Sequence, residues 1–172
     1  ADDYWVANKL QTCHDLILKN PSYNIFSHNE IYKKLDGTDA LLKNGLFEYD
    51  DISKSLYIKN TLSTSSVILH KDLLKTYGYF DVTLKSSQDY DLWLKLAPGL
   101  KPFHIDLTLG EYIEIEDSIT SKYYFFRFLD QMRIAFRHRK YVNIFFLIKK
   151  LSKILFSKQW IFGIFNSRKH GF

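Results

Sequence analysis

The amino-acid sequence predicts an α/β fold, and three observations support this prediction. Segments with helical periodicity alternate with short segments rich in β-branched and aromatic residues, the pattern of a sheet flanked by helices. The composition is that of a globular protein, with 46% hydrophobic and 25% charged residues. At 172 residues, the chain is long enough to form one domain with a sizeable core.

The first part of the chain should form a helix, a strand and a long loop. Residues 6–19 carry apolar side chains at helical spacing and precede Asn20-Pro21, so we expect a helix. Its buried side should contain Leu10, Cys13 or His14, and Ile17. Residues 23–28 alternate and are rich in aromatic side chains, which favours a strand. Residues 33–51 are polar and contain turn signals, and a long irregular stretch of this kind is often a binding loop.

The middle of the chain should contain short helices and strands separated by turns. Residues 78–81 should form a turn that carries Tyr79 and Phe80 into the core. The other elements that we expect are a helix at 52–59, a strand at 67–69, a helix at 71–76, and strands at 103–109 and 111–116 joined tightly at Gly110.

Residues 88–97 should form a helix with two carboxylates in its first turn. Ser87 can cap its N-terminus through the hydroxyl group, and Pro98-Gly99 ends it. The helix dipole favours the ionised forms of Asp89 and Asp91, and a carboxylate that stays ionised at neutral pH can act as a general base. The alternative is an ordinary acidic first turn without a catalytic role.

Charge divides the chain into two parts. Residues 1–121 contain 12 Lys/Arg and 18 Asp/Glu, a net charge of −6. Residues 122–172 contain 12 Lys/Arg and one acidic residue, Asp130, a net charge of +11. This asymmetry indicates two roles, and the basic part points to an anionic partner. The single cysteine, Cys13, excludes an internal disulfide framework and fits a reducing compartment.

Residues 122–172 should form basic amphipathic helices. Aromatic and aliphatic side chains recur there at helical spacing, with Arg and Lys between them. Such helices suit the interface of an anionic membrane. The alternative is that they pack on the rest of the domain and present a solvated basic face. Nucleic acid is not expected as a partner, because no recognisable nucleic-acid-binding module accompanies the basic residues.

Four short motifs follow one another along the chain. They are Asp2-Asp3-Tyr4-Trp5, Thr64-Ser65-Ser66, Gly78-Tyr79-Phe80-Asp81 and Gln88-Asp89-Tyr90-Asp91-Leu92-Trp93. This order resembles the C-terminal half of the catalytic domain of a bacterial family 2 glycosyltransferase with the GT-A fold. The resemblance covers residues 1–121 and is carried mainly by residues 64–96. It implies a mixed sheet with flanking helices, and an N-terminal nucleotide-binding half that would precede Ala1.

The resemblance also implies a divalent metal, Mn²⁺ or Mg²⁺. Family members carry an Asp-x-Asp motif that holds the metal, and Asp2 matches its metal-contacting Asp, while Asp3 would either support the metal ligands or hydrogen-bond the sugar. A nucleotide-sugar leaves as a diphosphate whose developing charge must be neutralised, and a hard cation held by carboxylates does this. Two adjacent acids near a helix are otherwise a solvated helix N-terminus.

In family 2 enzymes, a Glu-Asp pair at a helix start supplies the base that deprotonates the acceptor. The matching pair here is Gln88-Asp89, so the resemblance makes Asp89 the expected base and Asp91 the second candidate. Gln88 can hydrogen-bond an acceptor hydroxyl, but it cannot take a proton. The remaining substrate-binding residues implied by the resemblance are Thr64, Ser65, Ser66 and Trp93.

The expected activity is that of a glycosyltransferase in which residues 1–121 form the acceptor-side half and residues 122–172 a basic tail. The donor would be a UDP-linked sugar, the acceptor a glycan or lipid-linked hydroxyl, and the stereochemistry inverting. Residues 1–172 alone should be inactive. The protein would lie at the inner face of the bacterial cytoplasmic membrane. The alternative function is a non-catalytic membrane-surface or partner-binding module built on a truncated GT-A fold.

Overall fold

The computed structural model describes residues 3–115 and 124–157, and in these residues it has an α/β fold with a mixed sheet of five strands. The predicted fold class is therefore confirmed at this level. In chain order, the elements are β1 (Tyr4–Trp5), α1 (Lys9–Lys19), β2 (Ile25–Lys33), β3 (Asp39–Leu42), α2 (Ile52–Ile58), the 3-10 turn η1 (Thr64–Ser66), β4 (Val67–Leu69), α3 (Lys71–Tyr77), α4 (Gln88–Leu96), the 3-10 turn η2 (Ala97–Gly99), β5 (Pro102–Ile113), α6 (Tyr124–Arg137), the 3-10 turn η3 (Arg139–Tyr141) and α7 (Ile144–Leu155).

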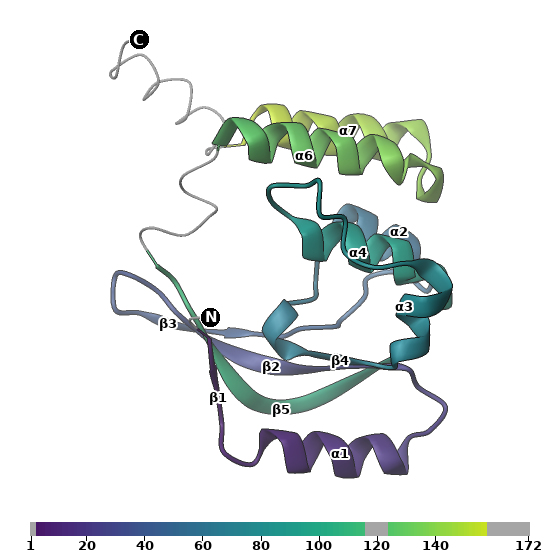
Figure 1. The fold of residues 1–172 in the computed structure, drawn as a ribbon. Helices are drawn as coiled ribbons and strands as arrows, with labels where there is room; N and C mark the ends of the chain where they lie inside the picture. The colour runs from purple at the N-terminus through teal and green to yellow at the C-terminus, as the bar shows by residue number, and fades with distance from the viewer. Residues whose placement is uncertain (1–2, 116–123, 158–172) are drawn as a thin grey trace.

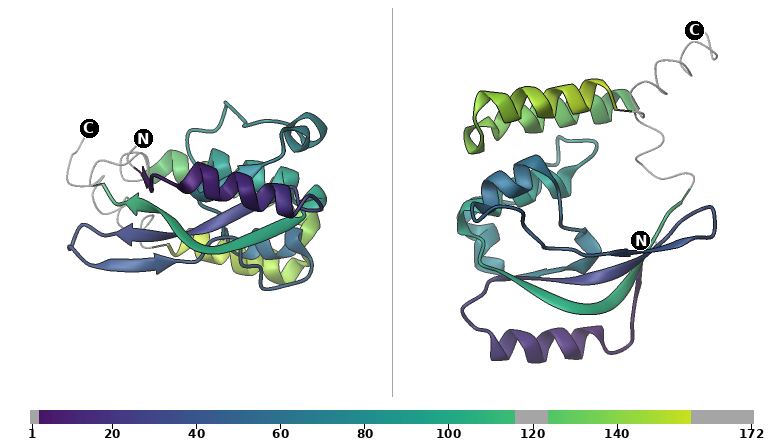
Figure 2. Two further views of the ribbon diagram at one scale, coloured as in Figure 1. Left: turned by 90° about the horizontal axis from the view of Figure 1, so that it is seen from below. Right: turned by 180° about the vertical axis from the view of Figure 1, so that it is seen from behind.

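The elements are stacked in layers (Figure 1). Helix α1 covers one face of the sheet, and α2, α3 and α4 lie over the other face. The hairpin of α6 and α7 lies beyond α2 and α4, on the side away from the sheet. Figure 2 shows the same order of layers from behind. The core accordingly has two parts, one between α1 and the sheet and a larger one among the sheet, α2–α4 and α6.

Strand β2 is the centre of the sheet. It pairs in parallel with β5 on one side and antiparallel with β4 and β3 on the other, while β1 pairs with the outer edge of β5. Because neighbours and helices cover it on all sides, residues 25–30 are all buried, including the polar Ser27, His28, Asn29 and Glu30. Buried polar groups need hydrogen-bond partners, which makes this strand a source of fixed polar contacts beneath the site.

Strand β5 is continuous through Gly110, so the prediction of two strands joined by a turn at this residue is wrong. Gly110 lies opposite Trp5 on β1 and Glu30 on β2. A Cβ atom on Gly110 would lie 3.0 Å from the backbone oxygen of Tyr4. The glycine therefore permits the close approach of a neighbouring strand. Glycine within a strand pattern often marks such a close approach of another backbone.

The expected loop at residues 33–51 contains β3, which pairs antiparallel with the end of β2. The prediction missed this strand because its four residues are too few to show alternation. Gly45, further along the segment, has φ +74°. A side chain there would collide with the Ser27 hydroxyl. Glycine thus lets the segment approach β2 and places Asn44 against the buried strand, where its amide donates to the His28 oxygen at 3.1 Å.

Helix α1 buries part of the side that its sequence predicted, since Cys13 is buried and Ile17 is partly buried in the same core cluster. Leu10 is instead 64% exposed, and Lys9, which was not predicted on this side, is buried. The Lys9 ammonium lies 3.6 Å from the centre of the Trp5 ring and donates to the backbone oxygen of Ser65 at 2.6 Å. The lysine stem therefore fills a core position while its charged end reaches η1, a contact that periodicity alone cannot reveal.

The helices over the other face of the sheet agree with the predictions for residues 52–59, 71–76 and 88–97 to within one or two residues. The turn after α3 does not. Tyr79 and Phe80 are 61% and 48% exposed, so the prediction that they enter the core is wrong. The C-cap residue of α3, Gly78, has φ +104°, and the chain turns outward from there.

Helices α6 and α7 pack on the helical layer, and they also expose large apolar side chains to the surface. Ile134 of α6 is fully buried in the larger core cluster. Tyr57 of α2 donates its hydroxyl hydrogen to the Ala135 oxygen at 2.8 Å, and the Tyr141 hydroxyl donates to the Leu94 oxygen at 3.0 Å. Within the described ranges, we find no helix with the length and hydropathy that a membrane-spanning segment requires.

Candidate functional site

Three surface pockets meet at Asp89, at the N-terminal end of α4. The sheet-side pocket extends from Asp89 across the sheet to Asp3. The helix-side pocket extends from Asp89 to Lys150 and Lys153 of α7. The loop-side pocket lies between Asp89 and residues 80–82. A single carboxylate therefore borders three separate spaces in which ligand groups could lie.

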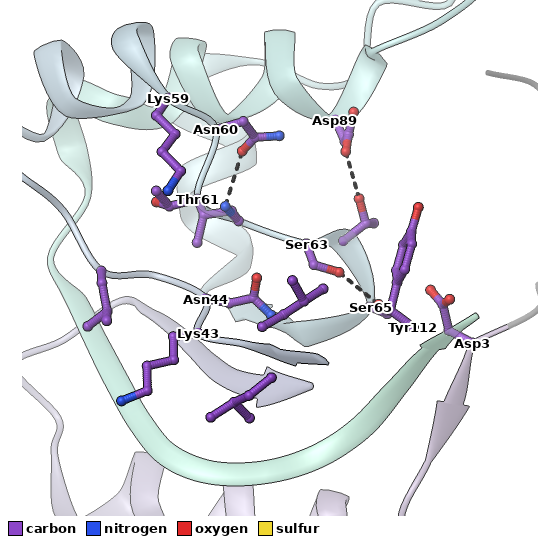
Figure 3. Close-up of a pocket in the computed structure, with 15 residues that line it drawn as sticks. Asp3, Lys43, Asn44, Lys59, Asn60, Thr61, Ser63, Ser65, Asp89 and Tyr112 are labelled. Carbon is purple, nitrogen blue, oxygen red and sulfur yellow. Dashed lines mark hydrogen bonds between the residues drawn. The ribbon is translucent and has the colours of Figure 1, made fainter. Parts of the chain in front are cut away.

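The sheet-side pocket has a volume of about 800 Å³. Figure 3 shows Asp3 and Asp89 on one side of it and Lys43 and Lys59 on the other, so that its ends differ in charge. Neutral hydrogen-bonding groups line the space between them. A cavity of this size with few charges and many hydroxyl and amide groups suits a polar organic ligand such as a sugar. These neutral groups belong to Asn44, Asn60, Thr61, Ser63, Thr64, Ser65 and Tyr112.

The loop before α4 sets the position of Asp89. Ser87 occupies the N-cap position with φ +57°, a left-handed conformation that is uncommon for a residue other than glycine. Its side chain makes no capping hydrogen bond, so the prediction that the Ser87 hydroxyl caps the helix is wrong. The loop is held instead from α6, where the Asp130 carboxylate accepts hydrogen bonds from the backbone N–H groups of Lys85 at 2.8 Å and Ser86 at 2.9 Å.

Asp89 keeps a carboxylate oxygen near the pocket surface. Oδ1 accepts a hydrogen bond from the Tyr90 backbone N–H at 2.8 Å, and Oδ2 accepts one from the Thr64 hydroxyl at 3.2 Å. The second contact joins α4 to η1, and both of its residues line the sheet-side pocket. Figure 3 draws this hydrogen bond as a dashed line from Asp89. Asp89 is only partly buried. The geometry leaves this carboxylate accessible to a ligand hydroxyl, as a general base requires.

A buried polar network lies beneath Ser65 and Asn44. The Glu30 carboxylate accepts hydrogen bonds from the Ser65 hydroxyl at 2.7 Å and the Asn44 amide at 3.0 Å. Lys9 binds the Ser65 oxygen from the other side. Burial lowers the pKa of Lys9, and the nearby acidic groups of Cys13, Glu30 and Asp3 offset part of this effect. The network fixes Ser65 and Asn44 in place with hydrogen bonds that are buried or partly buried.

Asp91, the second candidate for the base, is fully buried. Its carboxylate accepts two hydrogen bonds from Arg137 at 2.9 Å each, lies 2.9 Å from the His138 Nε2 atom, and forms an ion pair with Lys95 at 2.9 Å. A ligand could reach it only by displacing these groups. The structure therefore places Asp91 in a structural ion cluster, and we retain Asp89 alone as the candidate base.

The other residues predicted for the site divide into two groups. Thr64 and Ser65 line the sheet-side pocket, and Gln88 lines the loop-side pocket, although its amide nitrogen already donates to the Leu84 oxygen at 2.9 Å. Ser66 and Trp93 are buried, and neither lines any of the three pockets. The Ser66 hydroxyl donates to the Ser63 oxygen, which holds η1 together. We do not include Ser66 and Trp93 in the proposed site.

The fit of a divalent metal rests on Asp3. Its carboxylate lines the sheet-side pocket and accepts a weak hydrogen bond from the Ile113 backbone N–H at 3.4 Å. Carboxylate oxygens are the donors that Mn²⁺ and Mg²⁺ prefer, so Asp3 fits a metal at this edge. Asp2, the expected ligand, lies outside the described residues. Among those that are described, no three acidic, histidine or cysteine side chains form a cluster that could hold a metal ion.

Several residues of the pockets were not predicted as site residues. Asn44, Lys43 and Tyr112 come from segments whose polar residues look like ordinary loop or strand-edge residues. Lys150 was predicted only as part of a basic helix face. The one available signal was the length of the polar segment at 33–51, which is typical of binding loops.

Comparisons with known proteins add no assignment to this geometry. No protein-family model and no curated protein sequence matches the chain. The function must therefore be argued from the pockets around Asp89 and from the motif order that resembles family 2 glycosyltransferases.

Proposed function

We propose that the chain is the acceptor-side part of a GT-A glycosyltransferase domain. The activity would be transfer of a sugar from a UDP-linked donor to a hydroxyl group of a glycan or lipid-linked acceptor. The observation that carries the proposal is the position of Asp89, an accessible carboxylate at a helix N-terminus where three pockets meet. This is the residue that the motif order marks as the base, and the site offers it separate spaces for donor and acceptor.

The proposed reaction is a single displacement at the anomeric carbon. Asp89 accepts the proton of the acceptor hydroxyl, and the acceptor oxygen forms the glycosidic bond as the bond from the anomeric carbon to the diphosphate breaks. Attack on the face opposite the leaving group inverts the configuration. Thr64, which donates to Asp89, holds the carboxylate in position. A divalent cation held by Asp2, with Asp3 beside it, would neutralise the charge on the leaving diphosphate.

The experiment that tests the proposal uses the complete gene product and a panel of nucleotide-sugars, with and without Mn²⁺. The assay follows release of the nucleotide, with glycans and lipid-linked saccharides supplied as acceptors. We expect metal-dependent release from one UDP-linked donor. A folded protein that releases no nucleotide from any donor, with or without acceptors, would contradict the proposal and favour a non-catalytic binding module.

We also propose that the helical hairpin places the protein at the inner face of the cytoplasmic membrane. Helices α6 and α7 expose several large apolar side chains. Six of them, each between 42% and 68% exposed, are Phe125, Leu129, Phe136, Ile144, Phe145 and Ile148. We call this set the outer hairpin face. The exposed Lys149 lies next to it in the sequence. Exposed apolar side chains beside basic ones suit the interface of an anionic bilayer.

The double variant Phe145→Glu/Ile148→Glu should bind phosphatidylglycerol vesicles at least about tenfold more weakly than the wild type, because it replaces apolar contacts by charges that anionic lipids repel. Co-sedimentation with vesicles measures the effect. The matched control is Leu18→Glu, since Leu18 is 66% exposed on α1, on the opposite side of the molecule. Equal binding by the double variant and the wild type would show that the outer hairpin face does not contact the bilayer.

A further inference from the structure

The helix-side pocket has a different chemistry from the sheet-side pocket. Its volume is about 390 Å³, and it is lined by three cationic side chains, Arg127 of α6 and Lys150 and Lys153 of α7. The one carboxylate of its lining is Asp89, at the border that it shares with the sheet-side pocket. The pocket is therefore a concave positive site that opens next to the candidate base.

The structure holds the Lys150 ammonium in a fixed place. The Tyr90 hydroxyl donates its hydrogen to the backbone oxygens of Tyr57 at 2.8 Å and Leu56 at 3.0 Å, so its oxygen is oriented as an acceptor. Lys150 Nζ donates to this oxygen at 3.0 Å and lies 4.7 Å from the centre of the Tyr90 ring. Burial and the neighbouring charge of Lys153 lower the pKa of Lys150 to about 8.

The positive charge of Lys150 has no compensating negative partner in the described part of the chain. Neither Lys150 nor Lys153 forms an ion pair with any described carboxylate. An ammonium group has three hydrogens, and the contact with Tyr90 uses one of them. A cation that is kept partly desolvated and partly unpaired is a natural contact for an anion, because charge-assisted hydrogen bonds are strongest where water is excluded.

We propose that the helix-side pocket binds a phosphate or diphosphate group of the acceptor, so that the acceptor hydroxyl lies at Asp89. This inference rests on the proposed function for the role of the group, whereas the anion site itself can be tested alone. Lys150 and Lys153 together match the two or more negative charges of such a group better than the single charge of a carboxylate. Gln131, which also lines the pocket, offers a neutral amide donor to the same oxygens.

The test is a calorimetric titration of the protein with inorganic pyrophosphate in the absence of metal and donor. We expect binding by the wild type, and binding at least about tenfold weaker by Lys150→Met/Lys153→Gln, because two charge-assisted contacts are lost. Methionine keeps the apolar stem of Lys150 and removes a partly desolvated charge, so the variant should remain folded. Circular dichroism confirms the fold before each titration.

Two single variants serve as controls. Lys43→Gln changes a cation of the sheet-side pocket, and Lys149→Gln changes an exposed cation of α7 that lines none of the three pockets. Both should bind pyrophosphate as the wild type does. Equal losses in these controls would overturn the proposal, since they would indicate diffuse attraction to a basic protein or binding in the sheet-side pocket. Absence of pyrophosphate binding by the wild type would overturn it as well.

Two further ligands separate the sources of the phosphate group. Geranyl diphosphate presents a lipid-linked diphosphate in solution, and phosphatidylglycerol vesicles present phosphate groups on a bilayer. If geranyl diphosphate binds and this binding weakens in the double variant, the result supports the site and favours a lipid-linked acceptor. If the wild type binds pyrophosphate more tightly than geranyl diphosphate, the result favours a phosphorylated glycan as acceptor. Binding to vesicles but to neither soluble ligand would overturn the proposal, because the basic residues would then contact the bilayer surface and the pocket would bind no anion. No titration here requires a nucleotide-sugar. Failure of this test therefore leaves the glycosyltransferase proposal intact, and failure of the nucleotide-release assay leaves the anion site intact.

Discussion

Replacement of Asp89 by Asn in the complete gene product should lower kcat for sugar transfer by about 10²–10⁴-fold. Asparagine has the shape of aspartate. Its oxygen can accept the hydrogen bond from the Tyr90 N–H while its amide group donates to the Thr64 hydroxyl, so the local structure should persist. Asparagine cannot take the proton of the acceptor hydroxyl. The Kd of the donor should therefore remain unchanged, because the loss concerns the chemical step alone.

The measurement combines steady-state kinetics with calorimetric titration of the donor. Asp15→Asn is the matched control, since Asp15 is an exposed carboxylate on α1. Among the described residues, it pairs with Gln11 and His14 of the same helix. It should leave kcat within about twofold of the wild type. Retained turnover in Asp89→Asn would remove Asp89 from the role of base.

Replacement of Asp91 by Ala should lower the free energy of unfolding by about 3–5 kcal/mol. The change removes the anion of a buried cluster and leaves Arg137 and Lys95 without it. Chemical denaturation measures the loss. Asp72→Ala removes an exposed carboxylate that pairs with Lys75 at 2.8 Å, and it should cost no more than about 1 kcal/mol. Equal effects of the two variants would contradict the structural role of the Asp91 cluster.

The same cluster should make stability depend on pH. Burial opposes ionisation of Asp91, but the hydrogen bonds from His138 and Lys95 and the charges of Lys95 and Arg137 outweigh it and hold the pKa of Asp91 below its ordinary value. The ionised form is thus favoured by folding. Its contribution is complete above pH ~4, the pKa of an unfolded aspartate, and is lost as the pH falls toward the lower pKa of the folded state. Denaturation of Asp91→Asn between pH 7 and 3 should show a smaller decrease than the wild type.

The elements that the sequence predicted well are those with local signals. Helix α2 follows Asp51, whose side chain accepts a hydrogen bond from the Lys54 N–H, and α4 ends at Pro98-Gly99 as expected. Caps, breakers and periodicity all lie within a few residues of the elements that they define. The motif order located Asp89 in the same way, as a residue of a short segment.

The features that the sequence did not predict depend on contacts between distant residues. In the sequence, Gly110 looks like a turn residue. In the structure it lies within β5, where β1 passes close beside it. Lys9 has the appearance of a surface residue, and its buried position depends on Ser65, 56 residues away. Asp89 and Asp91 both lie in the first turn of α4, and the contacts of Asp91 with Arg137 and His138 distinguish the structural carboxylate from the accessible one. These contacts join residues that are far apart in the sequence, so no local sequence pattern predicts them.

The contact of Asp91 with Arg137 and His138 bears on how the molecule loses its structure. If α6 and α7 separated from α4 while the rest stayed native, a buried carboxylate would lose two of its partners and Asp130 would release the loop before Asp89. A partial opening of this kind is costly, so we expect the hairpin and α4 to unfold as one cooperative unit. The net charge of the sequence changes sign near residue 121, but the cooperative folding unit includes elements from both sides of this point.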